Sequence, residues 1–158
     1  MSRILVVANQ TLGGDALLKS VQDRMTEGPC EFTLLVPATG PAYWTSTEMM
    51  GHLGGAGPPP HPGASEDAEE DDYARARQRL EYGIEELHRV GARVDGEVGA
   101  RDPVKAIEHA LARRRFDEII LSTLPSGKSR WLSQDLPHKV RRKFGLPVTV
   151  VTASEPRR

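Results

Sequence analysis

The chain has 158 residues, a length that fits one domain of ordinary size with a buried core. Its formal net charge of −1 does not indicate a nucleic-acid or membrane surface, and no apolar run approaches the roughly 20 residues that span a bilayer. The single cysteine, Cys30, excludes an internal disulfide and has no partner at a metal-ligand spacing. Because the chain begins almost directly with a strand-like run, we expect no secretory signal. These features predict a soluble cytoplasmic protein, with no nucleic-acid and no membrane partner.

The first part of the chain alternates strand-like and helix-like patterns. Residues 3–8 are a continuous apolar run rich in β-branched side chains, which is typical of a strand covered on both faces of a parallel sheet. Apolar residues at helical spacing predict a helix over residues 15–25, which ends before a Gly-Pro pair. Residues 31–36 are predicted to form the second strand, closed by Pro37.

Residues 38–72 form a long irregular stretch, which we expect to be a flexible insertion in a single domain covering residues 1–158. The stretch contains a Gly-Gly pair, a run of glycine and prolines, and an acidic block at residues 66–72. Such a composition cannot bury enough apolar surface to offset the chain entropy. We interpret the acidic block as a solvated cap of the helix that follows, rather than as a metal-binding or protein-binding motif. A local fold of residues 44–53, as a lid or partner contact, stays open.

The second part of the chain continues the same alternation. An amphipathic helix is predicted over residues 73–90, and a weaker third strand over residues 92–98. The next helix starts at Asp102, a favourable N-cap followed by a proline in the first turn. The remaining predicted elements are a strand over 118–121, a helical pattern over 129–144 and a fifth strand over 146–151.

Strands that alternate with helices predict an α/β fold with a parallel, doubly wound sheet of five strands, which is flavodoxin-like or Rossmann-like. Ligands of such sheets bind at the carboxyl ends of the strands, at a topological switch point. The loops that begin there are headed by Asn9, Pro37, Gly99 and Ser122. We expect a ligand site among these loops.

The loop at residues 122–129 is the first candidate for an anion site. It consists of small and polar residues between a buried strand and a helix, whose free N–H groups and dipole favour negative charge. Residues 127–129 match the second half of the phosphate-binding pattern GxxxxGK[ST]. However, Ser122 stands where the first glycine belongs, and Pro125 removes an N–H donor. The sequence therefore does not favour a P-loop NTPase.

Two other patterns are weaker. Residues 11–16 resemble the SGGxDS loop of ATP pyrophosphatases, but the aspartate stands one residue early and the second serine is missing. A basic cluster falls in the last turns of a predicted helix, where cations complement the helix dipole. Its members are Lys139, Arg141, Arg142 and Lys143. We interpret this cluster as a solvated helix end rather than as a nucleic-acid patch.

Four stretches resemble the universal stress protein family, over nearly the whole chain apart from residues 38–72. Residues 4–9 resemble its first strand, which usually ends in aspartate, and residues 102–107 resemble its G-D-P-x-x-A-I helix start. Residues 116–121 resemble its D-x-I-V strand, and residues 146–151 its terminal P-V-x-V-V strand. The resemblance implies an adenine nucleotide alpha hydrolase-like sheet with strand order 3-2-1-4-5. It also implies a non-catalytic module with a role in the stress response.

ATP-binding members of that family carry a G-x2-G-x9-G-[ST] pattern after the fourth strand, and this chain departs from it. Ser122 and Pro125 stand near the expected first glycines, and Gln134 and Asp135 near the final Gly-[ST]. Asp135 is well placed to be the N-cap of the following helix, where its carboxylate would repel a phosphate. Two negative charges about 4 Å apart cost about 4 kcal/mol at an effective dielectric of about 20. Residues 126–130 offer donors and charge that could hold a phosphate in a shifted pose.

ATP or a related adenine nucleotide is therefore the candidate ligand, with no metal site. The resemblance implies that Asn9 contacts the ribose, that Val36 offers backbone groups to the adenine, and that Gly99 permits a close backbone approach. The candidate phosphate donors are Ser122, Thr123, Ser126, Gly127, Lys128 and Ser129. One alternative is a nucleotide-hydrolysing or adenylating enzyme using the loop at 122–129, for which no general base or metal-holding acid can be named. The other is a nucleotide-free interaction module.

The fifth predicted strand is the candidate partner surface. Its central residues carry no charge that would block pairing with another strand: they are Val148, Thr149, Val150 and Val151. An exposed apolar edge invites another chain, and the family resemblance implies homodimers joined through this strand. The alternative is that residues 38–72 of the same chain cover the edge.

Overall fold

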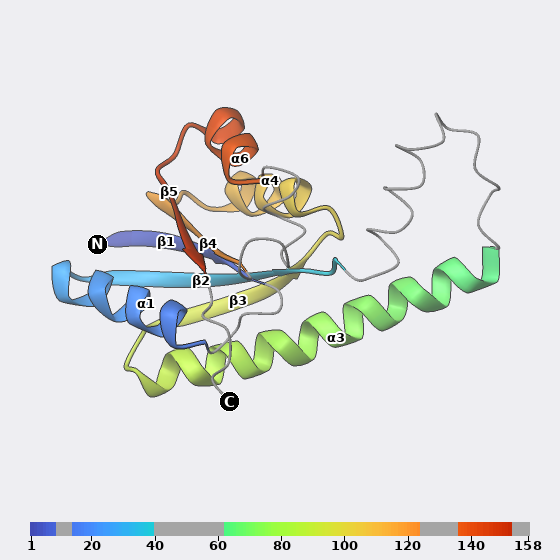
Figure 1. The fold of residues 1–158 in the computed structure, drawn as a ribbon, viewed down its shortest axis with the longest axis horizontal. Helices are drawn as coiled ribbons and strands as arrows, with labels where there is room; N and C mark the ends of the chain where they lie inside the picture. The colour runs from blue at the N-terminus through green and yellow to red at the C-terminus, as the bar shows by residue number, and fades with distance from the viewer. Residues whose placement is uncertain (9–13, 40–61, 124–135, 153–158) are drawn as a thin grey trace.

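The computed structural model of the chain describes residues 1–8, 14–39, 62–123 and 136–152 (Figure 1). Its centre is one parallel sheet of five strands in the order β3-β2-β1-β4-β5. The strands are β1 (Ser2–Val7), β2 (Cys30–Pro37), β3 (Val94–Gly99), β4 (Glu118–Thr123) and β5 (Val148–Thr152). The predicted α/β class, the parallel sheet and the order 3-2-1-4-5 are confirmed.

Helices cover both faces of the sheet (Figure 1). The helices of the described residues are α1 (Asp15–Glu27), α3 (Pro62–Arg89), α4 (Pro103–Arg113) and α6 (Leu136–Phe144). One face packs against α1 and α3, and the other against α4 and α6. The predicted N-cap of α4 is confirmed, because Oδ1 of Asp102 accepts a hydrogen bond from the backbone N–H of Val104 at 2.9 Å.

β1 lies at the centre of the sheet and is buried on both faces. Ile4 and Val6 pack with α1 and α3, whereas Leu5 and Val7 pack with α4 and α6. Each of these four side chains is at most 2% exposed. Because a fully buried aliphatic side chain contributes about 1.5–3 kcal/mol, this strand is a main source of stability. The prediction of a first strand covered on both faces is confirmed.

β3 is an edge strand with one apolar and one polar face. Val94 and Val98 pack against the cluster that contains α3. Asp95 and Glu97 alternate with them and therefore point to the other face. There Asp95 and Glu97 form ion pairs with Arg114 and Arg113 respectively, which follow or end α4. This alternation explains why the third strand gives a weaker apolar signal in the sequence than β1 does.

The start of α3 corrects the prediction for the acidic block. The helix begins at Pro62 rather than at residue 73, so residues 66–72 lie within it and not before it. The last of these residues, Asp72, is not a solvated cap: its side chain is 4% exposed and pairs with Arg101, with 3.0 Å between Oδ2 and Nη2. Residues 40–61 of the predicted insertion lie outside the described residues.

Candidate functional site

The carboxyl ends of β1 and β4 lie side by side, with Val7 in register with Leu121. After β1 the chain passes to α1 on one face of the sheet, and the next helix that the structure describes after β4 is α6, on the other face. This divergence is the topological switch point at which open α/β sheets bind ligands. The structure therefore has a topological switch point between β1 and β4, at the carboxyl ends of the strands, as predicted.

Ser122 and Thr123 are the last two residues of β4, so the prediction that they begin the loop is wrong. The ladder with β5 extends to both of them, in register with Val151 and Thr152. Each of the two side chains is only 2% exposed. Both candidates thus reach the carboxyl edge from a rigid strand rather than from a loop.

The hydroxyl of Thr123 is a buried polar atom at this edge. Its Oγ1 accepts from and donates to no described residue. A buried hydroxyl without a hydrogen-bond partner costs about 1–3 kcal/mol, and such an atom in a native protein calls for an explanation. A polar ligand group at the end of β4 would supply the partner.

Val36 and Gly99 lie at the same edge, on β2 and β3. Val36 has a fully buried side chain in the cluster with α1 and α3, and its backbone is in register with Val98. Gly99 ends β3, and its C=O accepts from the N–H of Ala38 at 3.1 Å. The proposed contacts of Val36 and Gly99 with an adenine nucleotide stay predictions.

The glycine at position 99 has a structural reason in the packing of α4. A Cβ atom there would lie 2.7 Å from Cβ of Ala106 and 2.9 Å from Cδ1 of Leu35. Contacts this short do not occur between real side chains, so α4 and β2 leave room for glycine alone. The missing side chain at position 99 lets α4 pack closely on β3, and the approach of a nucleotide to Gly99 stays a prediction.

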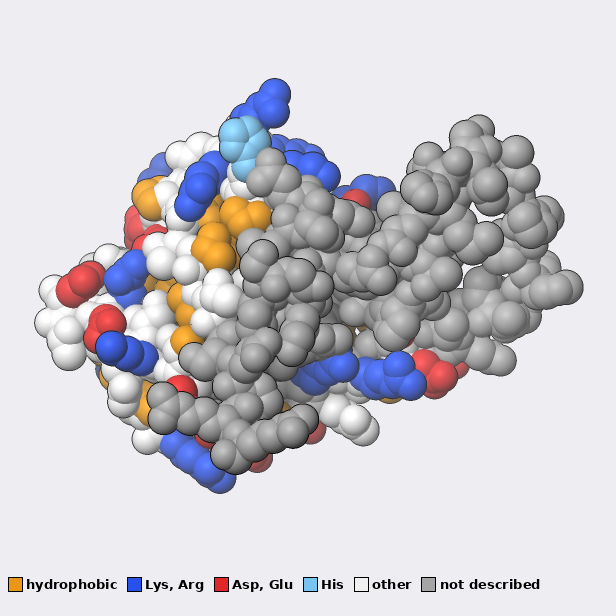
Figure 2. All heavy atoms as spheres, in the orientation of Figure 1, with side chains coloured by type: hydrophobic (Ala, Val, Ile, Leu, Met, Phe, Trp, Pro, Cys, Tyr) orange, Lys and Arg blue, Asp and Glu red, His pale blue; other side chains and the backbone are white. Residues whose placement is uncertain are grey.

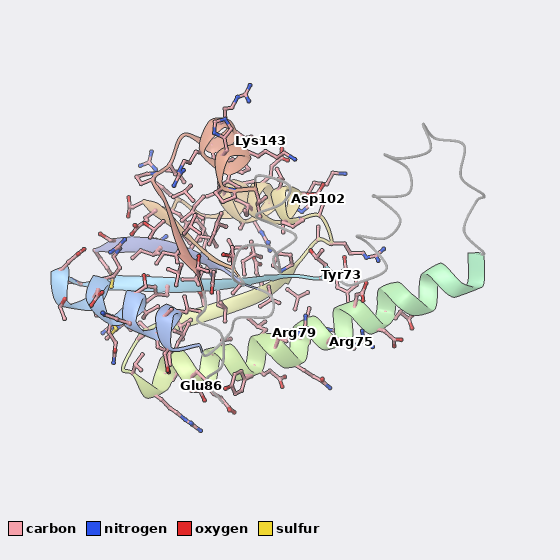
Figure 3. All side chains as sticks on the ribbon, in the orientation of Figure 1. Tyr73, Arg75, Arg79, Glu86, Asp102 and Lys143 are labelled. Atoms are coloured by element: carbon pink, nitrogen blue, oxygen red, sulfur yellow. The ribbon has the colours of Figure 1, made fainter. Side chains whose placement is uncertain are left out.

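The connection between β3 and α4 is fixed by residues that sequence reasoning missed. Asp72 of α3 forms the buried ion pair with Arg101, and Oγ1 of Thr39 donates to the backbone C=O of Arg101. Figure 3 shows Tyr73 of α3 and Asp102 of this connection near the same end of the sheet. The sequence did hold a signal for Asp72, because it lies four residues before Ala76 on the buried face of the helix.

The remaining candidates are not placed by the structure. Asn9 follows β1, and the rest of the candidate phosphate loop follows β4; all lie outside the described residues, as do Pro125 and Asp135. The residues of that loop are Ser126, Gly127, Lys128 and Ser129. Among the candidates that the structure describes, Ser122 and Thr123 end β4 with their side chains toward opposite faces of the sheet, and Val36 and Gly99 lie at the ends of β2 and β3.

A groove of about 450 Å³ lies at the opposite, amino edge of the strands. Its lining includes Arg3, Glu31 and Arg93. Most of its charges are already paired: Arg3 lies 3.8 Å from Glu31, and Arg114 lies 2.5 Å from Asp95. Among the described residues, no group of His, Cys, Asp and Glu side chains could hold a metal ion, and no helix is long and apolar enough to cross a membrane.

β5 forms one edge of the sheet, as predicted. Val148 is buried, and Thr149, Val150 and Val151 are partly buried. The N–H of Ile119 bonds the C=O of Pro147, so the next carbonyl, that of Val148, faces the outer edge. Nη2 of Arg141 donates to this carbonyl at 3.0 Å. One acceptor of the outer edge is therefore occupied by the chain itself.

Neither a protein-family model nor a curated protein matches the chain. A universal stress protein family protein from Arabidopsis thaliana with AMP bound has a TM-score of 0.60 at 13% identity, over 98% of this chain and 93% of that one. The Archaeoglobus fulgidus universal stress protein in complex with dAMP has a TM-score of 0.56 at 12% identity, over 96% and 97% of the two chains. A universal stress protein in complex with cAMP has a TM-score of 0.54 at 15% identity, over 97% and 98%. The chain thus has the α/β fold of the universal stress proteins, as its motifs predicted.

Proposed function

We propose that this protein is a non-catalytic module of the universal stress type that binds an adenine nucleotide at the carboxyl edge of its sheet. The site lies between the ends of β1 and β4, and the protein acts as a homodimer in a stress response. Three proteins with the same fold have structures that contain AMP, dAMP or cAMP. The fold supports the location of the site, and the ligands of these proteins support its chemistry.

The observation that carries the proposal is the buried hydroxyl of Thr123. It ends a strand at the switch point, where a phosphate or ribose oxygen of a bound nucleotide would give it a hydrogen-bond partner. Ser122, the neighbouring candidate, is equally buried at the same strand end. The unpartnered hydroxyl of Thr123 at the end of a buried strand suits a polar ligand better than it suits a closed apolar core.

Native mass spectrometry of the purified protein tests the proposal. We expect a retained adenine nucleotide, or an added mass when AMP or ATP is supplied. A protein that retains no nucleotide and takes up neither compound would contradict the proposal. Phosphate release from ATP above a blank without protein, lost in Lys128→Ala, would instead favour the enzyme alternative.

Asp135 gives a prediction from the sequence about the affinity for ATP. Its carboxylate is expected to repel the phosphates, so Asp135→Ser should tighten ATP binding, by about tenfold if about 1.4 kcal/mol of repulsion is removed. Calorimetric titration of ATP into the wild type and the variant measures the change. Unchanged or weaker affinity in Asp135→Ser would exclude the repulsion.

A further inference from the structure

The sheet face that packs against α4 and α6 is hollowed at the amino ends of β1, β2 and β3. A groove of about 450 Å³ lies there, and we call it the amino-edge groove. Its lining includes Arg3, Glu31, Thr33, Arg93, Asp95 and Arg114. A smaller hollow of about 130 Å³ shares three of these residues and reaches Arg113 at the end of α4. Sites for small molecules have volumes of about 300–1,000 Å³, so the groove is large enough for such a ligand.

Three charged side chains form a row across the groove. Arg3 of β1 is in register with Glu31 of β2. Phe32 of β2 is in register with Val94 of β3, so Arg93, one residue earlier, lies on the other side of Glu31. The residue that follows each member of the row packs on the face with α1 and α3, so the three charged side chains point to the opposite face. The row therefore has the charge order positive, negative, positive, with about 10 Å between the backbones of the two arginines.

The backbone of both arginines is fixed by hydrogen bonds. The N–H of Arg3 donates to Oδ2 of Asp117 at 2.9 Å, and the C=O of Arg3 accepts from the N–H of Asp117 at 2.8 Å. The C=O of Arg93 accepts from the N–H of Phe32 at 2.9 Å. The sheet thus holds the two guanidinium groups on either side of Glu31, so a ligand does not have to order the backbone when it binds.

The members of the row keep hydrogen-bonding capacity for a ligand. Nε of Arg3 lies 3.8 Å from Oε2 of Glu31, which is beyond hydrogen-bond distance. Arg93 is exposed and forms no ion pair with any residue that the structure describes. Asp95, by contrast, is bonded at both carboxylate oxygens, to Arg114 and to a threonine hydroxyl. A ligand in the groove would therefore meet the row rather than Asp95.

The charge order of the row selects a ligand with the opposite order: negative, positive, negative. A free dicarboxylic amino acid has this order, because its ammonium group lies between two carboxylates. Each carboxylate can accept hydrogen bonds from one guanidinium group, a pairing that suits the fork of arginine, and the ammonium group can donate to Glu31. A dicarboxylate without an amino group, or a phosphate, would instead place its negative charge beside Glu31 with nothing to offset the repulsion.

We propose that the amino-edge groove binds free aspartate or glutamate, with Arg3 and Arg93 on the two carboxylates and Glu31 on the ammonium group. The groove lies at the opposite edge of the sheet from the nucleotide site and does not depend on it. Its charged side chains are open to solvent, so each contact is weak and the dissociation constant should be about 1 mM. Because the contacts are electrostatic, the affinity should fall as salt is added.

Amide NMR titrations with aspartate, glutamate and succinate, at equal and low ionic strength, test the site. Both amino acids should shift the amide signals of Phe32 and Val94, and succinate should bind about tenfold more weakly. Arg93→Gln should weaken aspartate binding about tenfold, because one carboxylate loses its partner. Arg142→Gln is the matched control: it removes an exposed arginine from α6, over which Figure 2 shows Lys and Arg side chains gathered, and should bind as the wild type does.

Glu31→Gln gives the sharpest result, because it should reverse the preference of the groove. The variant should bind aspartate more weakly and succinate more tightly than the wild type does, since the partner of the ammonium group and the repulsion of a dicarboxylate disappear together. The dispersion of the amide signals shows that each variant keeps its fold. A wild type without shifts in the groove, equal affinity for succinate and aspartate, or Arg93→Gln and Glu31→Gln variants that bind as the wild type does would each overturn the proposal. Titrations with and without AMP should agree, so a failure of the nucleotide site leaves this result unchanged.

Discussion

Glu118 joins three elements of the fold through one carboxylate. Nε and Nη2 of Arg24 donate to its two oxygens at 2.8 and 2.7 Å, and Oγ1 of Thr149 donates to Oε2 at 3.1 Å. Arg24 belongs to α1, Glu118 to β4 and Thr149 to β5. The hydrogen bonds from Arg24 are the main reason why the pKa of Glu118 lies below its ordinary value. The network therefore ties α1 to the edge of the sheet.

Glu118→Gln should lower the free energy of unfolding at neutral pH by about 1 kcal/mol, because a charge-assisted pair becomes a neutral one. Because its pKa is lowered in the folded state, Glu118 stabilises the fold at pH values above its unfolded pKa of about 4.5. This stabilisation is lost as the pH falls through the folded pKa. The difference between wild type and variant should therefore shrink in acid. Urea unfolding at several pH values measures the difference, with Glu31→Gln as a control that changes little, because the side chain of Glu31 is half-exposed and its ion pair with Arg3 is long, at 3.8 Å. An equal difference at every pH would exclude the pKa argument.

Gly96 marks the place where α3 packs directly on β3. A Cβ atom there would lie 2.6 Å from Cδ1 of Leu80 and 2.7 Å from the backbone oxygen of Leu34. The backbone oxygen cannot move aside, so Gly96→Ala should lower the free energy of unfolding by about 1–3 kcal/mol. Gly28→Ala is the matched control, since nothing lies within 4 Å of its added Cβ. Chemical denaturation that shows equal effects for both variants would contradict this account of the packing.

At the scale of elements, the buried strands are the part of the fold that sequence patterns predict best. β1 and β4 are continuous apolar runs because both of their faces are covered, and α4 has an Asp-Pro start that is confirmed. The sequence pattern predicts too short a helix for α3, because its first residues are acidic and show no apolar periodicity. The apolar signal of β3 in the sequence is weak because its polar face bears Asp95 and Glu97. Local sequence patterns thus predict an element poorly where only one of its faces, or neither, packs against the core.

The candidate site was predictable in position but less so in its contacts. Alternation of strands and helices places the ends of β1 and β4 together, and this needs no knowledge of distant pairs. The ion pair of Asp72 with Arg101 joins residues 29 positions apart, and that of Arg24 with Glu118 joins residues 94 apart. Such partners depend on the packed fold, and no local motif specifies them.

At the scale of the whole molecule, β5 is the edge proposed to pair with a second copy. Its outer edge carries uncharged side chains, and lysine on an edge strand prevents pairing. Val150→Lys should therefore turn a dimer into a monomer, with Thr26→Lys, at an exposed position of α1, as a control that leaves the dimer unchanged. Sedimentation in high salt measures the mass, and circular dichroism confirms the fold. A wild-type monomer, or a Val150→Lys dimer, would exclude pairing through β5.

Calorimetric titration of AMP into the wild type and Thr123→Val, together with urea unfolding of both, tests the nucleotide site most directly. Valine has nearly the shape of threonine without the hydroxyl, so the variant should unfold with a free energy about 1 kcal/mol higher. Its affinity for AMP should be about fivefold weaker, because the ligand loses a hydrogen bond. Thr26→Val should bind as the wild type does. A wild type that binds no AMP, or a Thr123→Val protein that binds it equally well, would contradict a nucleotide site at the end of β4.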